Sequence, residues 1–184
     1  ALSGDKRSSA QAFLGARGRN ASAEIVLPSR IIGRYWRADA AAMANCWNQA
    51  TVGAAQTGAV GMQGNVANAL AALFIACGQD VACVSEATTS ITRFEVTSTA
   101  DLYASVTLPY LIVGTVGGGT FLPTARECLA MLGCVGEGTA AKFAEICAVL
   151  ALAGELSIVG AMASGAFAQA HASGGRKGRG TGDT

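Results

Sequence analysis

The chain has 184 residues, of which 51% are hydrophobic and 14% are charged, and its formal net charge is +1. A chain of this length can bury a sizeable core, but so small a net charge provides no global field that would attract a nucleic acid. Because aromatic residues make up only 6% of the chain, a surface that stacks on bases is not expected either.

Hydrophobic periodicity and capping residues predict an α+β fold with a small sheet and many helices. In chain order, the pattern indicates a strand over 21–27, a helix over 40–56, a helix from Gly58 or Met62 to Cys77, strands over 90–97 and 101–113, a helix from Pro123 to Gly133, and one or two helices over 139–172.

Individual residues mark the ends of these elements. Asp39 is a suitable N-cap for the helix over 40–56, because its carboxylate can accept a hydrogen bond from a free amide of the first turn. Gly78 and Gly133 follow two other helices, and glycine readily adopts the left-handed conformation that ends a helix. Pro109 lies inside the third predicted strand and predicts an irregularity or an edge position, because proline has no amide hydrogen.

Two segments are apolar and long enough to raise the question of a membrane span, namely 58–77 and 144–172. The first contains three amide side chains, and the second contains Glu145, Glu155 and several glycines. A spanning helix needs about 20 predominantly apolar residues with few or no charges. We therefore expect buried helices of a soluble protein. No secretory signal is visible at the start of the chain, and a cytoplasmic location is the prediction.

The six cysteines stand at positions 46, 77, 83, 128, 134 and 147. They form no Cys-x-x-Cys pair, and His171 is the one histidine of the sequence, so the ligand spacing of a zinc site is missing and no metal is expected. Most of these cysteines lie in apolar helical runs, where a free thiol behaves as a small hydrophobic side chain. A reducing compartment fits this pattern better than a disulfide scaffold.

A glycine-rich loop over 114–120 has the sequence Gly-Thr-Val-Gly-Gly-Gly-Thr. Glycine allows positive φ and close approach to a ligand, and the exposed amides of such a loop can face an anion. The loop matches neither the common Gly-Lys-Ser/Thr phosphate loop nor Gly-x-Gly-x-x-Gly. Taken alone, the loop is therefore a weak signal, and an ordinary turn between a strand and a helix is the favoured interpretation.

Several short motifs occur together with this loop. They are Asp5-Lys6-Arg7, Ala-Cys-Gly-Gln-Asp over 76–80, Asp-Leu-Tyr over 101–103, Ala-Gly-Glu-Leu-Ser over 153–157, and His171. In this order, from about residue 2 to residue 171, they resemble the 3-hydroxy-3-methylglutaryl-coenzyme A (HMG-CoA) reductase family. The resemblance implies that residues 1–172 are the C-terminal part of the large, substrate-binding domain of that family. Residues 173–184, rich in glycine and basic residues, are expected to be a disordered tail.

The resemblance also implies catalytic roles for three residues. Lys6 would stabilise the carbonyl oxygen that gains negative charge during reduction of the thioester. Asp80 would hold the Lys6 ammonium in a proton network. His171 would protonate the departing coenzyme A thiolate, a task that suits an imidazole. The implied reaction takes two hydrides from NADPH, with NADH not excluded, and produces mevalonate and free coenzyme A.

Binding roles carry over from the family in the same way. The polar residues that would contact the hydroxymethylglutaryl group are Ser3, Asp5, Arg7 and Asn68. The apolar wall near its methyl group would consist of Ile158, Ala161 and Met162. The cofactor would contact Gly117, Gly118, Gly119 and Thr120.

Some features depart from the family pattern. Gln49 stands where these enzymes usually have an active-site lysine. The family's catalytic glutamate, its dimer-forming segment and the small domain that holds most of the NADPH precede the Asp5-Lys6 region, so this chain is expected to be incomplete and inactive alone. A homodimer or higher homo-oligomer is expected of the parent enzyme. Two alternatives remain: a diverged, non-catalytic protein that binds an acyl-coenzyme A, and a helical assembly or membrane-associated module rich in small residues.

Overall fold

A computed structural model describes residues 4–15 and 17–165 of the chain. Its sheet has three antiparallel strands, β1 (Arg19–Leu27), β2 (Ile91–Val96) and β3 (Leu102–Leu111), in the order β1-β3-β2. The predicted α+β class with a small sheet is confirmed.

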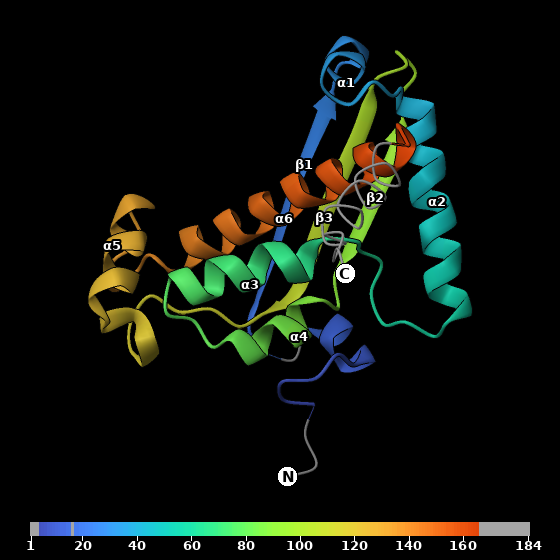
Figure 1. The fold of residues 1–184 in the computed structure, drawn as a ribbon. Coiled ribbons are helices and arrows are strands. Elements are labelled where there is room, and N and C mark those ends of the chain that lie inside the picture. The colour runs from blue at the N-terminus through green and yellow to red at the C-terminus, as the bar shows by residue number, and fades with distance from the viewer. Residues whose placement is uncertain (1–3, 16, 166–184) are drawn as a thin grey trace, which may run out of the picture.

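Helices make up most of the remaining structure. The α-helices are α1 (Ser29–Trp36), α2 (Ala40–Gln56), α3 (Val66–Ala76), α4 (Val84–Ala87), α5 (Pro123–Met131) and α6 (Ala140–Ala163). Three short 3-10 helices are η1 (Ala10–Leu14), η2 (Val81–Cys83) and η3 (Gly118–Phe121). Figure 1 shows α6 crossing the strands with α3 alongside it, and α2 beside β2 at one side of the molecule.

Over most of its length, the sheet is buried on one face only. Along β3, Leu102, Ala104, Val106 and Leu108 are all buried and alternate with half-buried Tyr103, Ser105 and Thr107. On the outward face, polar side chains of neighbouring strands form hydrogen bonds. For example, the Tyr103 hydroxyl of β3 donates to the Glu24 carboxylate of β1 at 2.7 Å. This alternation is expected of an antiparallel sheet that packs helices against one face.

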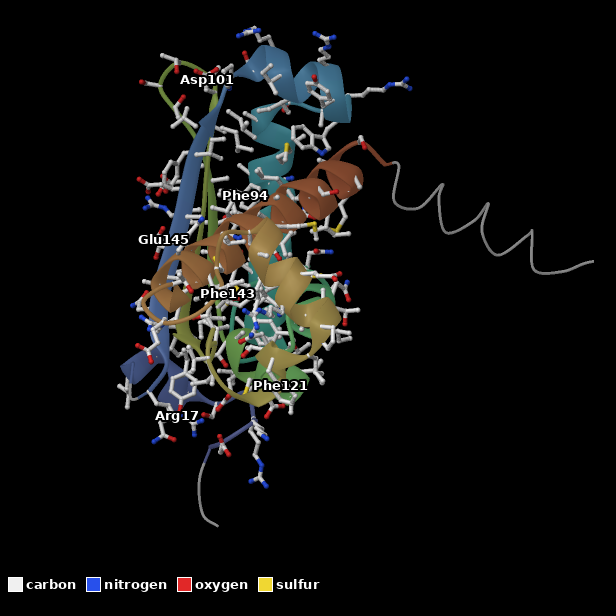
Figure 2. All side chains as sticks on the ribbon, turned by 90° about the vertical axis from the view of Figure 1, so that its left-hand side faces the viewer. Arg17, Phe94, Asp101, Phe121, Phe143 and Glu145 are labelled. Atoms are coloured by element: carbon white, nitrogen blue, oxygen red, sulfur yellow. The ribbon has the colours of Figure 1, made fainter. Side chains whose placement is uncertain are left out.

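Helix α6 forms the centre of the core. It contacts β1, β3, α2 and α3, and its buried residues include Phe143. Figure 2 labels Phe143 together with Phe94 of β2, which is also almost completely buried. Among the described residues, α6 is the one helix long and apolar enough to cross a membrane. Because it packs against the sheet and against two helices, we assign it as the core helix of this fold.

Local sequence signals located some elements correctly. Helix α2 begins at Ala40, and the Asp39 carboxylate accepts the Ala42 amide at 2.7 Å, so this cap is confirmed. Gly78 and Gly133 have φ of 65° and 63°, as expected of glycines that follow helices. Helix α1 was not predicted, because Pro28 and a short amphipathic run of eight residues give only a weak signal.

The predicted start of α3 is wrong. The helix begins at Val66, not at Gly58 or Met62. Met62 instead forms a single bridge to the edge of the sheet: its amide donates to the Ser90 carbonyl at 2.7 Å, and its carbonyl accepts the Thr92 amide at 2.9 Å. Pairing with β2 therefore keeps this segment extended and delays the helix.

Pro109 lies in the central strand β3, so an edge position is wrong, but an irregularity is present. The β2 pairing ends at Ile91 opposite Thr107, before the proline is reached. On the other side, the β1 register shifts between Arg19 and Ala21. The missing amide hydrogen of Pro109 is thus placed where the ladder is already interrupted.

Candidate active site

The start of β1 and the end of β3 meet at one end of the sheet, since Arg19 pairs with Leu111. This antiparallel pairing brings together the segment before β1 and the glycine-rich loop after β3. Figure 2 shows Arg17 and Phe121 at this end of the molecule, with Asp101 at the other. Lys6 and Asp80, two of the residues predicted to be catalytic, therefore share one region with the residues predicted to bind the cofactor.

Asp5 and Lys6 occupy the tip of a tight turn. The Arg7 amide donates to the Gly4 carbonyl at 3.2 Å, which makes Asp5 and Lys6 the two central residues. Lys6 has a φ of 56°, a left-handed conformation that is uncommon for a side chain other than glycine or asparagine. Adjacent side chains of such a turn point in different directions, and here Lys6 and Asp5 reach different partners.

The Lys6 ammonium lies 2.7 Å from Asp80 Oδ2. The hydrogen bond and the charge of Asp80 raise the pKa of Lys6, and the hydrogen bond from Lys6 lowers the pKa of Asp80. Both side chains are about half exposed, at 47% and 50%. An ion pair with this exposure adds little to stability, because water screens it. Its geometry nevertheless leaves a charged ammonium that a ligand can reach.

Asp80 is oriented by a second contact. Its other oxygen, Oδ1, accepts the Ala82 amide at 3.0 Å and so caps the 3-10 helix η2. One carboxylate oxygen is thus held by backbone, and the other is presented to Lys6. Behind this pair lies the Cys83 thiol, whose pKa is raised to about 11, first by burial and then by Glu86. A thiol with so high a pKa is a poor nucleophile at neutral pH, so Cys83 has no evident catalytic role.

The backbone just before Asp80 packs directly against the glycine-rich loop. Gly78 and Gly119 touch: a Cβ on Gly119 would lie 2.8 Å from the Gly78 carbonyl oxygen. Next to them, the Gln79 side chain donates to the Gly114 carbonyl at 2.8 Å and accepts the Gly114 amide at 2.9 Å. Glycine is required at both touching positions, since neither backbone leaves room for a side chain.

A shallow pocket of about 180 Å³ opens beside this junction. Its lining includes Asp80 and the predicted cofactor-binding residues Gly117, Gly118 and Thr120. Gly117 and Gly118 have φ of 81° and 57°, and a Cβ on either would meet no atom within 4 Å. Space of this kind beside backbone amides suits close approach of a ligand.

The residues predicted to bind the substrate are more widely separated than the Lys6–Asp80 pair and the glycine-rich loop. Asp5 turns away from Lys6 and pairs with Arg17 at 2.7 Å. Arg7 is exposed and makes no ion pair within the part of the chain that the structure describes, and Asn68 is exposed on α3. Ser3 and His171 lie outside the described residues.

The predicted apolar wall lies on the C-terminal half of α6. Met162 lines a separate cavity of about 50 Å³ with Trp47 and Glu155. Ile158 lies against the backbone of Gly64, since a Cβ on Gly64 would be 3.4 Å from it. Ala161 is half-buried and lines neither the 50 Å³ cavity nor the pocket at the glycine-rich loop.

Three residues of structural importance were missed from sequence alone: Gln79, Arg17 and Glu155. Gln79 lies inside the Cys-Gly-Gln-Asp motif, so the motif itself was the available signal. Arg17 offered no signal in the sequence. Its partner, Asp5, is brought close to it only by the turn over residues 4–7, which the sequence pattern did not predict. Glu155 interrupts an apolar helical run, and a charged residue at a buried helix position implies a specific partner. That partner is the start of α3, whose amides of Gly64 and Val66 donate to the Glu155 carboxylate.

The chain is similar in sequence to known proteins. The family model described as hydroxymethylglutaryl-coenzyme A reductase matches residues 1–176. Among curated proteins, the chain is 41% identical over 168 residues to the 3-hydroxy-3-methylglutaryl-coenzyme A reductase of Methanocaldococcus jannaschii, an alignment that covers 91% of this chain and 41% of the relative.

Two further relatives carry the same name. Identity to the protein of Pyrococcus horikoshii is 42%, covering 93% of this chain and 44% of the relative. Identity to the protein of Aeropyrum pernix is 51% over 125 residues, covering 65% of this chain and 30% of the relative. The chain thus spans less than half the length of these relatives. With a family model that covers nearly all of it, the chain belongs to the hydroxymethylglutaryl-coenzyme A reductase family.

Proposed function

We propose that the protein containing this chain reduces HMG-CoA to mevalonate with NADPH and releases coenzyme A. The observation that carries this proposal is the Lys6–Asp80 pair beside the pocket at the glycine-rich loop. Membership in the reductase family supports the same reaction. Within it, the chain supplies the C-terminal part of the large, substrate-binding domain over residues 1–172.

Lys6 stabilises negative charge on the reacting carbonyl oxygen. As the thioester carbonyl is reduced, its oxygen gains charge, and a fixed cation within hydrogen-bonding distance lowers the energy of that state. The pKa of Lys6 is raised by Asp80, so the ammonium stays charged at neutral pH. Its partial exposure allows the same ammonium to contact a bound substrate.

Asp80 keeps the ammonium in place and connects it to the pocket. Its pKa is lowered by the hydrogen bond from Lys6 and by the Ala82 amide, so it remains a carboxylate at neutral pH. An anionic partner of this kind favours the charged form of lysine and fixes its direction. Lys6 and Asp80 therefore act as a unit.

The glycine-rich loop fits a dinucleotide cofactor. Positive φ at Gly117 and Gly118, with open space where a Cβ would be, leaves the backbone free to approach phosphate or nicotinamide groups. A nicotinamide dinucleotide would supply the hydride for the reaction. Gly117, Gly118, Gly119 and Thr120 would hold it, with NADPH as the cofactor proposed and NADH as the alternative.

The substrate contacts follow the family. Ser3, Asp5, Arg7 and Asn68 would bind the hydroxymethylglutaryl group, and Ile158, Ala161 and Met162 would line its apolar side. His171 would donate a proton to the coenzyme A thiolate, which an imidazole can do near neutral pH. We further propose a cytoplasmic enzyme that acts as a homodimer or higher homo-oligomer.

A Lys6→Ala variant tests this function in the complete protein that contains the chain. NADPH absorbance is followed with HMG-CoA as substrate. Removing one group that stabilises an oxyanion costs about 100-fold or more in kcat, so the variant should lose at least that much. Lys142→Ala is the control, because Lys142 is an exposed lysine whose ammonium donates to the Gly133 carbonyl.

Two results would contradict the proposal. Folded wild-type protein that binds HMG-CoA without oxidising NADPH would instead indicate the alternative, a protein that binds an acyl-coenzyme A without catalysis. That alternative is suggested by Gln49, which is exposed and stands where the family usually has a lysine. Equal kcat for Lys6→Ala and wild type would remove Lys6 from the mechanism.

A further inference from the structure

Two ion pairs extend in different directions from one turn. Lys6 pairs with Asp80, and its neighbour Asp5 pairs with Arg17, each at 2.7 Å. Because Asp5 and Lys6 are the central residues of the turn closed by Gly4 and Arg7, a change in the backbone of one residue also changes the direction of the other side chain. The position of the Lys6 ammonium is therefore linked to the Asp5–Arg17 contact.

Arg17 is itself held by the end of the sheet. Its guanidinium carbon lies 6.0 Å from the ring centroid of Tyr110, which is buried in β3. The backbone of the next residue, Gly18, lies in close contact with β3, since a Cβ there would lie 2.8 Å from the Leu111 carbonyl oxygen. A guanidinium placed on an aromatic face gains orientation as well as attraction. Arg17 thus connects the turn to a rigid strand.

The other side of the turn is fixed separately. The Ser8 hydroxyl donates to the Ser85 carbonyl and lies 2.9 Å from the Thr88 hydroxyl, so this side is attached to α4. With Ser8 on one side and Arg17 on the other, the left-handed backbone of Lys6 is constrained from both directions. Uncommon backbone conformations persist where the surrounding contacts fix them, and such residues cluster at functional sites.

We propose that Arg17 is a positioning residue for the reaction, acting through Asp5 on Lys6. This inference rests on the proposed function, in which Lys6 contacts the reacting oxygen. Arg17 performs two tasks. It fixes the turn that aims the Lys6 ammonium, and it neutralises the Asp5 carboxylate beside a site that must accept an anionic substrate.

The two tasks predict separate kinetic effects. Loss of the Asp5–Arg17 contact displaces Lys6 and lowers kcat, because even a small displacement of a catalytic group lowers the rate of the chemical step. An unpaired Asp5 carboxylate repels the substrate's carboxylate and raises KM. Arg17→Lys keeps the charge but not the planar group, so it should recover KM while kcat stays below the wild-type value.

The experiment compares Arg17→Gln with Arg93→Gln in the complete protein. Arg93 is a matched control away from the site, since it pairs with Glu95 and lies 5.8 Å from the ring centroid of Tyr103. Arg17→Gln should lower kcat/KM between about tenfold and a hundredfold, whereas Arg93→Gln should leave kcat and KM unchanged.

A second measurement does not depend on activity. Trypsin cleaves after Lys6 and Arg7, and mass spectrometry of the fragments gives the rate at each site. The rate should rise severalfold in Arg17→Gln and stay at the wild-type value in Arg93→Gln, because only the first variant frees the turn.

The possible outcomes separate the two proposals. If Lys6→Ala is inactive but Arg17→Gln matches Arg93→Gln in kinetics and cleavage, the role of Arg17 is overturned and the reductase function stands. If the wild-type protein does not reduce HMG-CoA, the proposed function fails. The cleavage rates then decide by themselves whether Arg17 holds the turn.

Discussion

At the residue scale, the cysteines differ in their chemical environment. All six thiols are free, and Cys77, Cys83, Cys134 and Cys147 are buried. Burial raises the pKa of Cys147 to about 12, and neighbouring thiols add to this shift. The thiolate is the reactive form, so at pH 8 Cys147 is held almost entirely as the unreactive thiol.

We therefore expect a thiol reagent to modify Cys46 and Cys128, which are partly exposed, long before Cys147. Peptide mass spectrometry after timed labelling at pH 8 measures the order, and labelling in urea provides the control in which all six react. Modification of Cys147 as fast as Cys128 in the folded protein would contradict the burial described above.

At the element scale, α3 begins where a distant carboxylate receives its first amides. Glu155 of α6 is buried and accepts the amides of Gly64, Asn65 and Val66. Such a contact satisfies amides that a helix start leaves free and places negative charge at its positive end. Burial raises the pKa of Glu155 even though these three amides act in the opposite direction.

Glu155→Leu removes the acceptor of these three amides, of which that of Val66 is buried, and should destabilise the protein by about 2–4 kcal/mol in urea unfolding. Glu155→Gln tests the pH dependence. Because the folded-state pKa is raised above the ordinary glutamate value of 4.5, the contribution of Glu155 is complete below pH 4.5 and decreases as the pH rises through the folded-state pKa. Glu155→Gln should remove this decrease, whereas Glu145→Gln, at an exposed position of the same helix, should retain it.

The elements also differ in how far sequence alone could predict them. Helix α2 has its cap next to it in the chain, so Asp39 was enough to locate its start. Helix α3 depends on Glu155, 91 residues after Gly64, and on the pairing of Met62 with the sheet. Contacts between distant residues leave no local pattern. For the same reason, the approach of Lys6 to Asp80 was expected from family resemblance and not from spacing.

At the scale of the whole molecule, stability is concentrated around α6. Phe143 is fully buried, whereas Val149 on the same helix is 61% exposed. Phe143→Ala should cost about 3–5 kcal/mol through lost burial and a cavity, and Val149→Ala should stay within about 0.5 kcal/mol. Urea unfolding followed by circular dichroism measures both. Equal effects of the two substitutions would show that α6 is not the centre of the core.

The contact between Gly78 and Gly119 has a mechanical consequence. Two backbones that touch without room for a Cβ cannot slide past each other, and the paired hydrogen bonds of Gln79 and Gly114 fasten them further. A displacement of the glycine-rich loop is therefore transmitted to Asp80 two residues away, and through Asp80 to the ammonium of Lys6. We therefore expect the glycine-rich loop and Asp80 to keep a fixed relative position, so that a substitution that displaces the loop would also displace the carboxylate that pairs with Lys6.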